Sequence, residues 1–189
     1  MRLLVTGGAG FIGANFAHRV LAGGDQVTVY DALTYAGNPD NLLGLAGHDG
    51  YRFVHADVCD AESLSAEMAD CDAVVHFAAE SHVDRSIADP DPFVSTNCGG
   101  TATLCEVALR VGVDRVVHVS TDEVYGSVVE GSSTEEDRLV PSSPYAASKA
   151  ASDLIALAYH HTHGLPVLVT RSSNNYGPRQ YPEKVIPLF

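Results

Sequence analysis

The chain has 189 residues, of which 46% are hydrophobic and 19% charged, an ordinary composition for one well-packed globular domain. Its formal net charge is −13, and that excess of acid argues against nonspecific nucleic-acid binding, which needs a basic face. No apolar run approaches the length that spans a bilayer, and the four cysteines show no Cys-x-x-Cys spacing. We therefore expect free thiols and a cytoplasmic location.

Short valine-rich runs alternate with helical segments along the whole chain. Strands are predicted at residues 3–5, 26–30, 51–55, 73–77, 115–119 and 167–171, and helices at about 11–21, 61–69, 92–111 and 145–161. Two segments, 34–50 and 126–143, are typical of loops. This alternation predicts an α/β fold: a doubly wound parallel sheet of the Rossmann type, covered by helices on both faces.

A glycine pattern, Gly7-x-x-Gly10-x-x-Gly13, joins the first strand to the first helix. In a dinucleotide site such glycines permit a tight turn, close approach of a pyrophosphate, and tight packing of helix on sheet. Asp31 ends the second strand, where a carboxylate would bind the adenosine ribose and disfavour a 2′-phosphate, so NAD is expected rather than NADP. The alternatives are a glycine-rich turn without a ligand and an aspartate that merely begins a loop.

Tyr145 and Lys149 are four residues apart at the start of a helix, so their side chains share one face. A lysine ammonium beside a phenol would lower the pKa of the tyrosine and make it a base for an alcohol. Asp122 and Glu123 stand together at the end of the fifth strand. They are not needed to move a hydride, so they suggest that protons and water also move; the alternative is a polar strand end.

These motifs together resemble the extended short-chain dehydrogenase/reductase family. Segments 31–38, 76–86, 120–126, 174–178 and 182–184 narrow the resemblance to the dTDP-glucose 4,6-dehydratases. The resemblance runs over the whole chain and implies a lyase of deoxysugar biosynthesis that uses NAD. Relatives that epimerise or decarboxylate nucleotide sugars usually lack the Thr121-Asp122-Glu123 triplet.

The resemblance implies a division of roles among the reactive side chains. Tyr145, helped by Lys149 and Thr121, would take the proton of the sugar 4-hydroxyl as a hydride leaves C4 for NAD. Glu123 would then remove the C5 proton, and a protonated Asp122 would donate to the C6 hydroxyl, which departs as water. The hydride would return to C6, giving dTDP-4-keto-6-deoxyglucose.

The remaining site residues are also implied by the resemblance. The expected cofactor-binding residues are Gly7, Gly10, Phe11, Ile12, Gly13, Asp31, Ala32, Leu33, Thr34, Asp57, Val58, Phe77, Ala78, Ala79, Ser81, Thr96, Tyr145, Lys149 and Asn175. The expected substrate-binding residues are Ser81, Thr121, Asn174, Lys184 and Val185. No metal is expected, because the histidines of His160-His161-x-His163 fit the end of a helix better than a metal site.

Domain organisation and assembly follow from the same likeness. Residues 1–176 are expected to form the NAD-binding Rossmann domain with the catalytic residues. Residues 177–189 would begin the substrate-binding region, whose remainder, a smaller C-terminal domain, would be missing. A homodimer through the helices at 92–111 and 145–161 is expected. The competing hypotheses are a 4-epimerase or decarboxylase of nucleotide sugars and an inactive NAD-binding fragment.

Overall fold

The computed structural model describes residues 1–182. Six strands form one parallel sheet in the order β3-β2-β1-β4-β5-β6. The chain moves from β1 outward to β3, then crosses to β4 on the other side of β1, so the strand order reverses between β1 and β4. Ligands of open α/β sheets bind beside such a reversal. The strands are β1 (Arg2–Thr6), β2 (Gln26–Asp31), β3 (Tyr51–His55), β4 (Ala73–His76), β5 (Arg115–Thr121) and β6 (Val167–Ser172).

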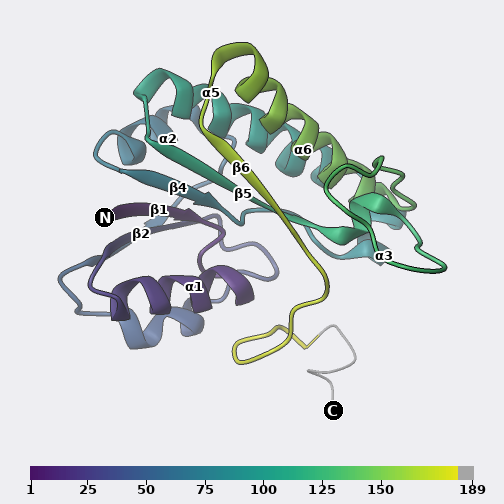
Figure 1. Ribbon diagram of the computed structural model, residues 1–189. Coiled ribbons are helices and arrows are strands. Elements are labelled where there is room, and N and C mark those ends of the chain that lie inside the picture. The colour runs from purple at the N-terminus through teal and green to yellow at the C-terminus, as the bar shows by residue number, and fades with distance from the viewer. Residues whose placement is uncertain (183–189) are drawn as a thin grey trace.

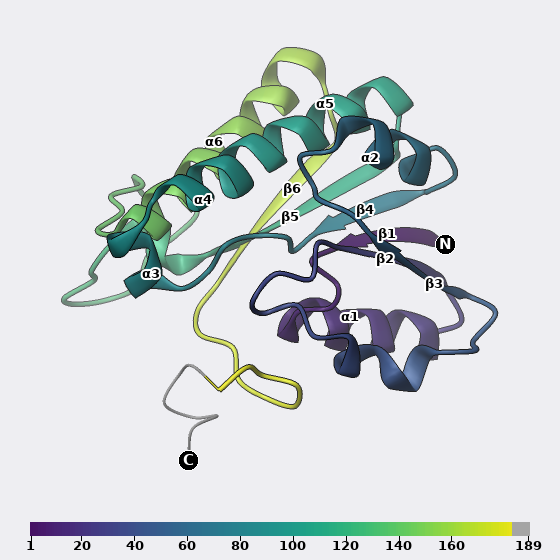
Figure 2. The same ribbon diagram turned by 180° about the vertical axis from the view of Figure 1, so that it is seen from behind.

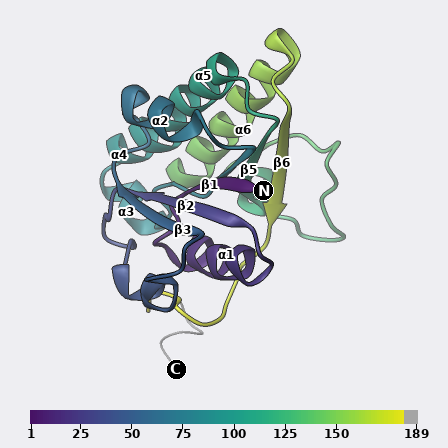
Figure 3. The same ribbon diagram turned by 90° about the vertical axis from the view of Figure 1, so that its left-hand side faces the viewer.

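Helices cover both faces of this sheet (Figures 1 and 2). One face carries α1 (Phe11–Ala22) and the 3₁₀ helix η1 (Pro39–Leu45). The opposite face carries α2 (Ala61–Met68), α5 (Thr101–Val111) and α6 (Pro144–His163), and Figure 3 shows the two layers from the side. The shorter elements are α3 (Val83–Ala88), α4 (Asp91–Phe93), the π-helix η2 (Val94–Gly100) and the 3₁₀ helix η3 (Asp122–Tyr125). The predicted doubly wound Rossmann-type fold is therefore confirmed.

The core lies on both sides of the central strands. Leu4 packs with Leu104 and Val116 beneath α5, whereas Val5 packs with Val29 and other residues beneath α1. Because successive side chains of a strand point to opposite faces, a central strand that is apolar throughout is buried on both. This explains why the inner strands contain nearly continuous runs of valine and leucine.

The structure differs from the sequence prediction in several helical segments, and the 3₁₀ helix η3 is one that was not predicted. The helix predicted over 92–111 is not one α-helix, because the π-helix η2 separates α4 from α5. The predicted loop 34–50 contains η1, which begins where Asn38 accepts a hydrogen bond from the Asp40 backbone. The short helix α3 was not predicted. The predicted loop 126–143 is confirmed, since it contains neither helix nor strand.

Helix α6 is the longest helix of the described residues and places the predicted Tyr145 and Lys149 pair. Ser143 caps its first turn by accepting a hydrogen bond from the Ala146 backbone, and Gly164, with φ of 73°, ends it. Within residues 1–182 no helix is both long and apolar enough to cross a membrane.

Candidate active site

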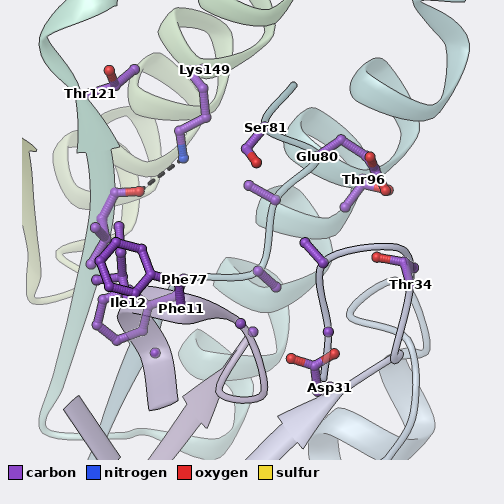
Figure 4. Close-up of a pocket in the computed structure, with 18 of the residues that line it drawn as sticks. Phe11, Ile12, Asp31, Thr34, Phe77, Glu80, Ser81, Thr96, Thr121 and Lys149 are labelled. Atoms are coloured by element: carbon purple, nitrogen blue, oxygen red, sulfur yellow. Dashed lines mark hydrogen bonds between the residues drawn. The ribbon is translucent and has the colours of Figure 1, made fainter. Parts of the chain in front are cut away.

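A pocket lies at the carboxyl ends of β1, β2, β4 and β5, where the strand order reverses. We call it the central pocket. Figure 4 shows Asp31 and Thr34 at one end of it and Thr121 and Lys149 at the other. The structure places the following predicted site residues in its lining: Gly7, Gly10, Phe11, Ile12, Gly13, Asp31, Ala32, Thr34, Asp57, Val58, Phe77, Ala78, Ala79, Ser81, Thr96, Thr121, Glu123, Tyr145, Lys149, Asn174 and Asn175.

Four predicted residues are not part of this lining as described. Leu33 lies beside the pocket with φ of 52°, and its backbone N–H donates to Asp31 Oδ1 at 2.8 Å. Asp122 is exposed and lines a neighbouring pocket instead. Lys184 and Val185 lie outside the described residues.

The glycine turn leaves no room for side chains. A Cβ atom on Gly7 would lie 2.5 Å from the Ala78 backbone nitrogen, and the φ of Gly7 is +67°. A Cβ atom on Gly13 would lie 2.4 Å from the Gly7 carbonyl oxygen. Gly10 is the N-cap residue of α1 and has no side chain to cap the helix, so no capping side chain bonds the N–H groups of the first turn. This is the arrangement that binds the phosphates of a dinucleotide.

Asp31 is held firmly by backbone groups. Its Oδ2 accepts a hydrogen bond from the Ala9 backbone at 2.9 Å, and its Oδ1 accepts one from Leu33. A carboxylate has about four acceptor sites, so both oxygens can still accept from a diol. Asp31 therefore both fixes the glycine turn and fits the ribose of a bound dinucleotide.

The reactive pair lies at the far end of the central pocket. Tyr145 is 9% exposed, and burial raises its pKa, as does the nearby Glu123, whereas a hydrogen bond with Thr121 lowers it. Lys149 is 4% exposed, and burial lowers its pKa to about 8, although the charge of Asp153 opposes that shift. Lys149 Nζ donates to the Val119 carbonyl at 2.9 Å (Figure 4).

The expectation that Lys149 lowers the pKa of Tyr145 is therefore wrong for the chain by itself. The lysine is turned towards a backbone carbonyl of β5, and burial of the phenol outweighs the favourable contacts. Tyr145 is a neutral phenol at neutral pH in this state. Ionising it requires further positive charge in the pocket.

Asn97 of the π-helix η2 connects the pocket wall to α6. It bonds the Glu80 backbone twice, accepting from the N–H at 2.8 Å and donating to the carbonyl at 3.0 Å. The same amide group donates to Ser148 Oγ at 2.8 Å, and Ser148 in turn donates to the Tyr145 carbonyl. The segment after β4 and the first turn of α6 are thus fixed relative to each other.

The two adjacent carboxylates occupy different surroundings. They lie in η3, where Thr121 Oγ1 accepts a hydrogen bond from the Glu123 backbone at 3.2 Å and donates to Asp122 Oδ1 at 3.4 Å. Glu123 is partly buried and lines both the central pocket and its neighbour, whereas Asp122 lines only the neighbour. We call this neighbour the outer pocket; it is lined by Asp122, Glu123, Tyr125, Gly126, Val128, Ser133, Thr134, Glu135, Val169, Thr170, Arg171 and Asn174. The two adjacent carboxylates therefore differ in environment, with Glu123 partly buried and Asp122 exposed.

Glu80 lies within the segment 77–81 that the resemblance assigns to the cofactor; it lines the central pocket, and burial raises the pKa of its carboxyl. Sequence reasoning missed Gln180 and Tyr181, which reach the pocket from the segment after β6. Tyr35 does not line the pocket, but its hydroxyl lies 3.2 Å from Ser81 Oγ. The positions of these three residues depend on how loops cross the sheet edge.

One of the three histidines near the end of α6 contacts the segment that follows the helix. His160 Nδ1 lies 2.8 Å from the Leu165 carbonyl, within hydrogen-bond distance. Over the described part of the chain, no three or more histidine, cysteine, aspartate or glutamate side chains are grouped so that they could hold a metal ion.

Comparison with known proteins decides the family. A family model described as GDP-mannose 4,6 dehydratase matches residues 4–189. The chain belongs to this family. Among curated members, it is 57% identical to the dTDP-glucose 4,6-dehydratase of Streptomyces niveus over 195 residues, which cover 100% of the chain and 58% of that protein. The chain thus spans less than two thirds of the length of this relative.

Solved structures in the family have the same fold. The crystal structure of DesIV, a dTDP-glucose 4,6-dehydratase from Streptomyces venezuelae with NAD and TYD bound, superposes with a TM-score of 0.97 at 60% identity. The superposition includes all of this chain and 60% of the DesIV chain. A UDP-glucuronic acid 4-epimerase from Bacillus cereus, in complex with UDP-glucuronic acid and NAD, superposes with a TM-score of 0.93 at only 30% identity, with 99% and 61% coverage. The resemblance to dTDP-glucose 4,6-dehydratases that the motifs indicated is confirmed.

Proposed function

We propose that the protein dehydrates dTDP-glucose to dTDP-4-keto-6-deoxyglucose with NAD as cofactor, as a lyase of deoxysugar biosynthesis. One observation carries the proposal: the central pocket brings the glycine turn, Asp31 and the Tyr145 and Lys149 pair into one cavity that Glu123 also lines. Identities of 57% and 60% to dTDP-glucose 4,6-dehydratases support the substrate.

The chain's own residues fit an NAD molecule along the central pocket. The uncapped first turn of α1 and the crowded glycines Gly7 and Gly13 would take the pyrophosphate, and Asp31 the adenosine ribose. The predicted residues around Asp57 and Thr96 would surround the adenosine half. When bound, NAD supplies a hydride acceptor for C4 of the sugar and the hydride donor for C6.

Tyr145 would accept the proton of the sugar 4-hydroxyl. Thr121 hydrogen-bonds to its phenol, and Lys149 is held within the same pocket lining. Burial raises the pKa of Tyr145, so the phenol acts as a base only with positive charge beside it. The Lys149 ammonium is one such charge below about pH 8, and the cationic nicotinamide ring of bound NAD would supply the further one.

The two carboxylates of η3 would carry out the proton transfers that eliminate water. Glu123 lines the central pocket, so it can reach the C5 proton that the 4-ketone makes acidic. Asp122 faces the outer pocket and would donate a proton to the C6 hydroxyl, which leaves as water. Ser81 and Asn174, with Lys184 and Val185, would bind the substrate. The sugar would therefore lie across the boundary between the two pockets.

Domain roles and assembly belong to the same proposal. Residues 1–176 would form the NAD-binding domain, and residues 177–189 would begin the substrate-binding region. The homodimer would form through the helices at 92–111 and 145–161, where the apolar side chains of Val94 and Leu154 are 57% and 59% exposed. Four free cysteines support a cytoplasmic location.

Analysis of the product separates the hypotheses. The protein is incubated with NAD and either dTDP-glucose or a nucleotide-linked uronic acid, and the sugar nucleotide is followed by mass spectrometry and by proton NMR. Loss of one water is the expected result. An unchanged mass with an inverted C4 centre would establish a 4-epimerase, and loss of carbon dioxide from a nucleotide-linked uronic acid would establish a decarboxylase. Retained NAD binding without turnover of either sugar nucleotide would indicate a non-catalytic NAD-binding module.

A further inference from the structure

A buried carboxylate lies one helical turn beyond Lys149 on α6. The Asp153 side chain is 0% exposed, and its Oδ2 accepts a hydrogen bond of 2.8 Å from Arg171 Nε on β6. Its Oδ1 lies 3.2 Å from His118 Nε2. Burial alone would raise the pKa of Asp153, but hydrogen bonds from its neighbours hold that pKa below its ordinary value. Asp153 is therefore an anion inside the protein, paired with an arginine.

The arginine continues this connection to the carboxylate turn. Arg171 Nη1 donates a hydrogen bond of 2.7 Å to the Tyr125 hydroxyl, and the guanidinium carbon lies 5.1 Å from the centre of the Tyr125 ring. Tyr125 is the last residue of η3, the turn that carries Asp122 and Glu123. One chain of contacts thus runs from α6 through β6 to the two proposed proton-transfer groups.

The geometry of these contacts restricts where the η3 turn can lie. A guanidinium group is planar, so bonds from its Nε and Nη1 leave in fixed directions. Asp153 orients the plane from one side, and Tyr125 meets it on the other. The Arg171 side chain is only 14% exposed, so little water could solvate its guanidinium group if the Asp153 carboxylate were removed. Movement of Arg171 would therefore be passed to Tyr125 and the turn.

We propose that Asp153 is a positioning residue for the water-elimination step, acting through Arg171 and Tyr125 on the turn that presents Asp122 and Glu123. This inference rests on the proposed dehydration. Asp153 does not touch the central pocket or the outer pocket. The effect that passes through Tyr125 is expected on elimination rather than on C4 oxidation, because the carboxylates of η3 act only after the ketone has formed. The charge of Asp153 also raises the pKa of Lys149, so Tyr125→Phe is the variant that isolates this effect.

Two variants test the connection at its two ends, with a matched control. Tyr125→Phe removes only the hydroxyl that accepts from Arg171, and Asp153→Asn removes the negative charge. Tyr159→Phe is the control, because the Tyr159 hydroxyl also bonds a charged side chain, Glu106 at 3.2 Å, yet lies outside both pockets. Single turnovers of the full-length protein are followed by absorbance of reduced cofactor for oxidation and by product mass for water loss.

Slower water loss relative to C4 oxidation is the expected result for Tyr125→Phe. Asp153→Asn should slow water loss too, and its C4 oxidation is compared at a pH well below 8, where Lys149 remains charged. Loss of a hydrogen bond to a charged group predicts a decrease of about tenfold in that ratio, so reduced cofactor accumulates transiently. Tyr159→Phe should keep the wild-type ratio. A lower melting temperature with an unchanged ratio in Tyr125→Phe would overturn the proposal, because it would assign the contacts to stability alone. Should Asp153→Asn fail to fold, Tyr125→Phe still decides.

A second measurement separates this inference from the proposed function. The amides of Gly126 and Val140 donate to carbonyls of η3, at 3.1 Å to Glu123 and 2.9 Å to Val124. Their hydrogen exchange reports the order of the turn whether or not dTDP-glucose is the substrate. Faster exchange in Tyr125→Phe than in Tyr159→Phe is expected. Equal exchange would refute the positioning role, whereas faster exchange without any dehydration by the wild-type protein would refute only the substrate assignment.

Discussion

The ammonium group of Lys149 donates a 2.9 Å hydrogen bond to the Val119 carbonyl on β5 while being almost fully buried. Burial lowers the pKa of this lysine to about 8. Below about pH 8 the folded protein holds a buried ammonium, and the full desolvation cost is present. Between about pH 8 and 10.5 the folded lysine is neutral while the unfolded one still binds a proton, so stability rises with pH in this window.

The variant Lys149→Met isolates this contribution. We expect the free energy of unfolding of the wild type, relative to that of the variant, to rise by up to about 3 kcal/mol across the window. Urea unfolding of both proteins at several pH values measures the difference. A difference that stays constant from pH 7.5 to 10 would show that Lys149 titrates as an ordinary exposed lysine.

Substitution of Gly7 is expected to abolish binding of NAD. An alanine Cβ would lie 2.5 Å from the Ala78 backbone nitrogen at a φ of +67°, so the turn would have to move. Calorimetric titration of NAD into Gly7→Ala should show an affinity at least about 100-fold weaker, equivalent to roughly 3 kcal/mol. Gly99→Ala is the control, since a Cβ atom there meets nothing within 4 Å. Equal loss of affinity in both variants would contradict a specific role for the turn.

Replacement of Asp31 by serine tests the choice of cofactor. The carboxylate disfavours a 2′-phosphate, so Asp31→Ser should weaken NAD binding while reducing the preference for NAD over NADP. The change in preference is expected to be about tenfold or more, because a charge repulsion is removed. Dissociation constants for both cofactors measure it. Parallel weakening of NAD and NADP would instead assign Asp31 only to its backbone bonds with Ala9 and Leu33.

The role of Asp122 as the C6 acid predicts a split between two steps. Asp122→Asn keeps the size of the side chain but cannot donate a carboxylic proton, so water loss should slow by about 100-fold or more while C4 oxidation is little changed. Glu136→Gln, an exposed carboxylate in the loop after η3, is the matched control. Rapid-quench mass analysis and cofactor absorbance follow the two steps. Equal slowing of both steps would argue against Asp122 as this acid.

Sequence reasoning predicted the sheet well because each strand carries its own signal. The run Tyr51–His55 was predicted with its observed limits, and β5 extends only two residues further than expected. Gly7, Asp31 and Tyr145 could be placed in one pocket because parallel strands end at one edge. Their local motifs fix both the element and the position along it.

Features that depend on distant contacts were not predictable in this way. The partner of Lys149 is a carbonyl of β5, and no local pattern shows which way a buried lysine turns. The exposure of Asp122 depends on how η3 sits beside the loop 126–143. Helix α3 has only six residues, too few for a clear apolar period, and its cap is His82 rather than a typical capping residue.

The π-helix η2 determines which way the side chains of α5 face relative to those of η2 itself. Because one extra residue in a helix turns everything after it by about 100°, η2 lets Asn97 face the pocket wall while Leu104, further along, faces the core. Deleting one residue between Val94 and Gly100 would restore a regular helix and put these two faces out of step. A change of length in this segment would therefore separate Asn97 from Glu80 or Leu104 from the core, even with every side chain retained.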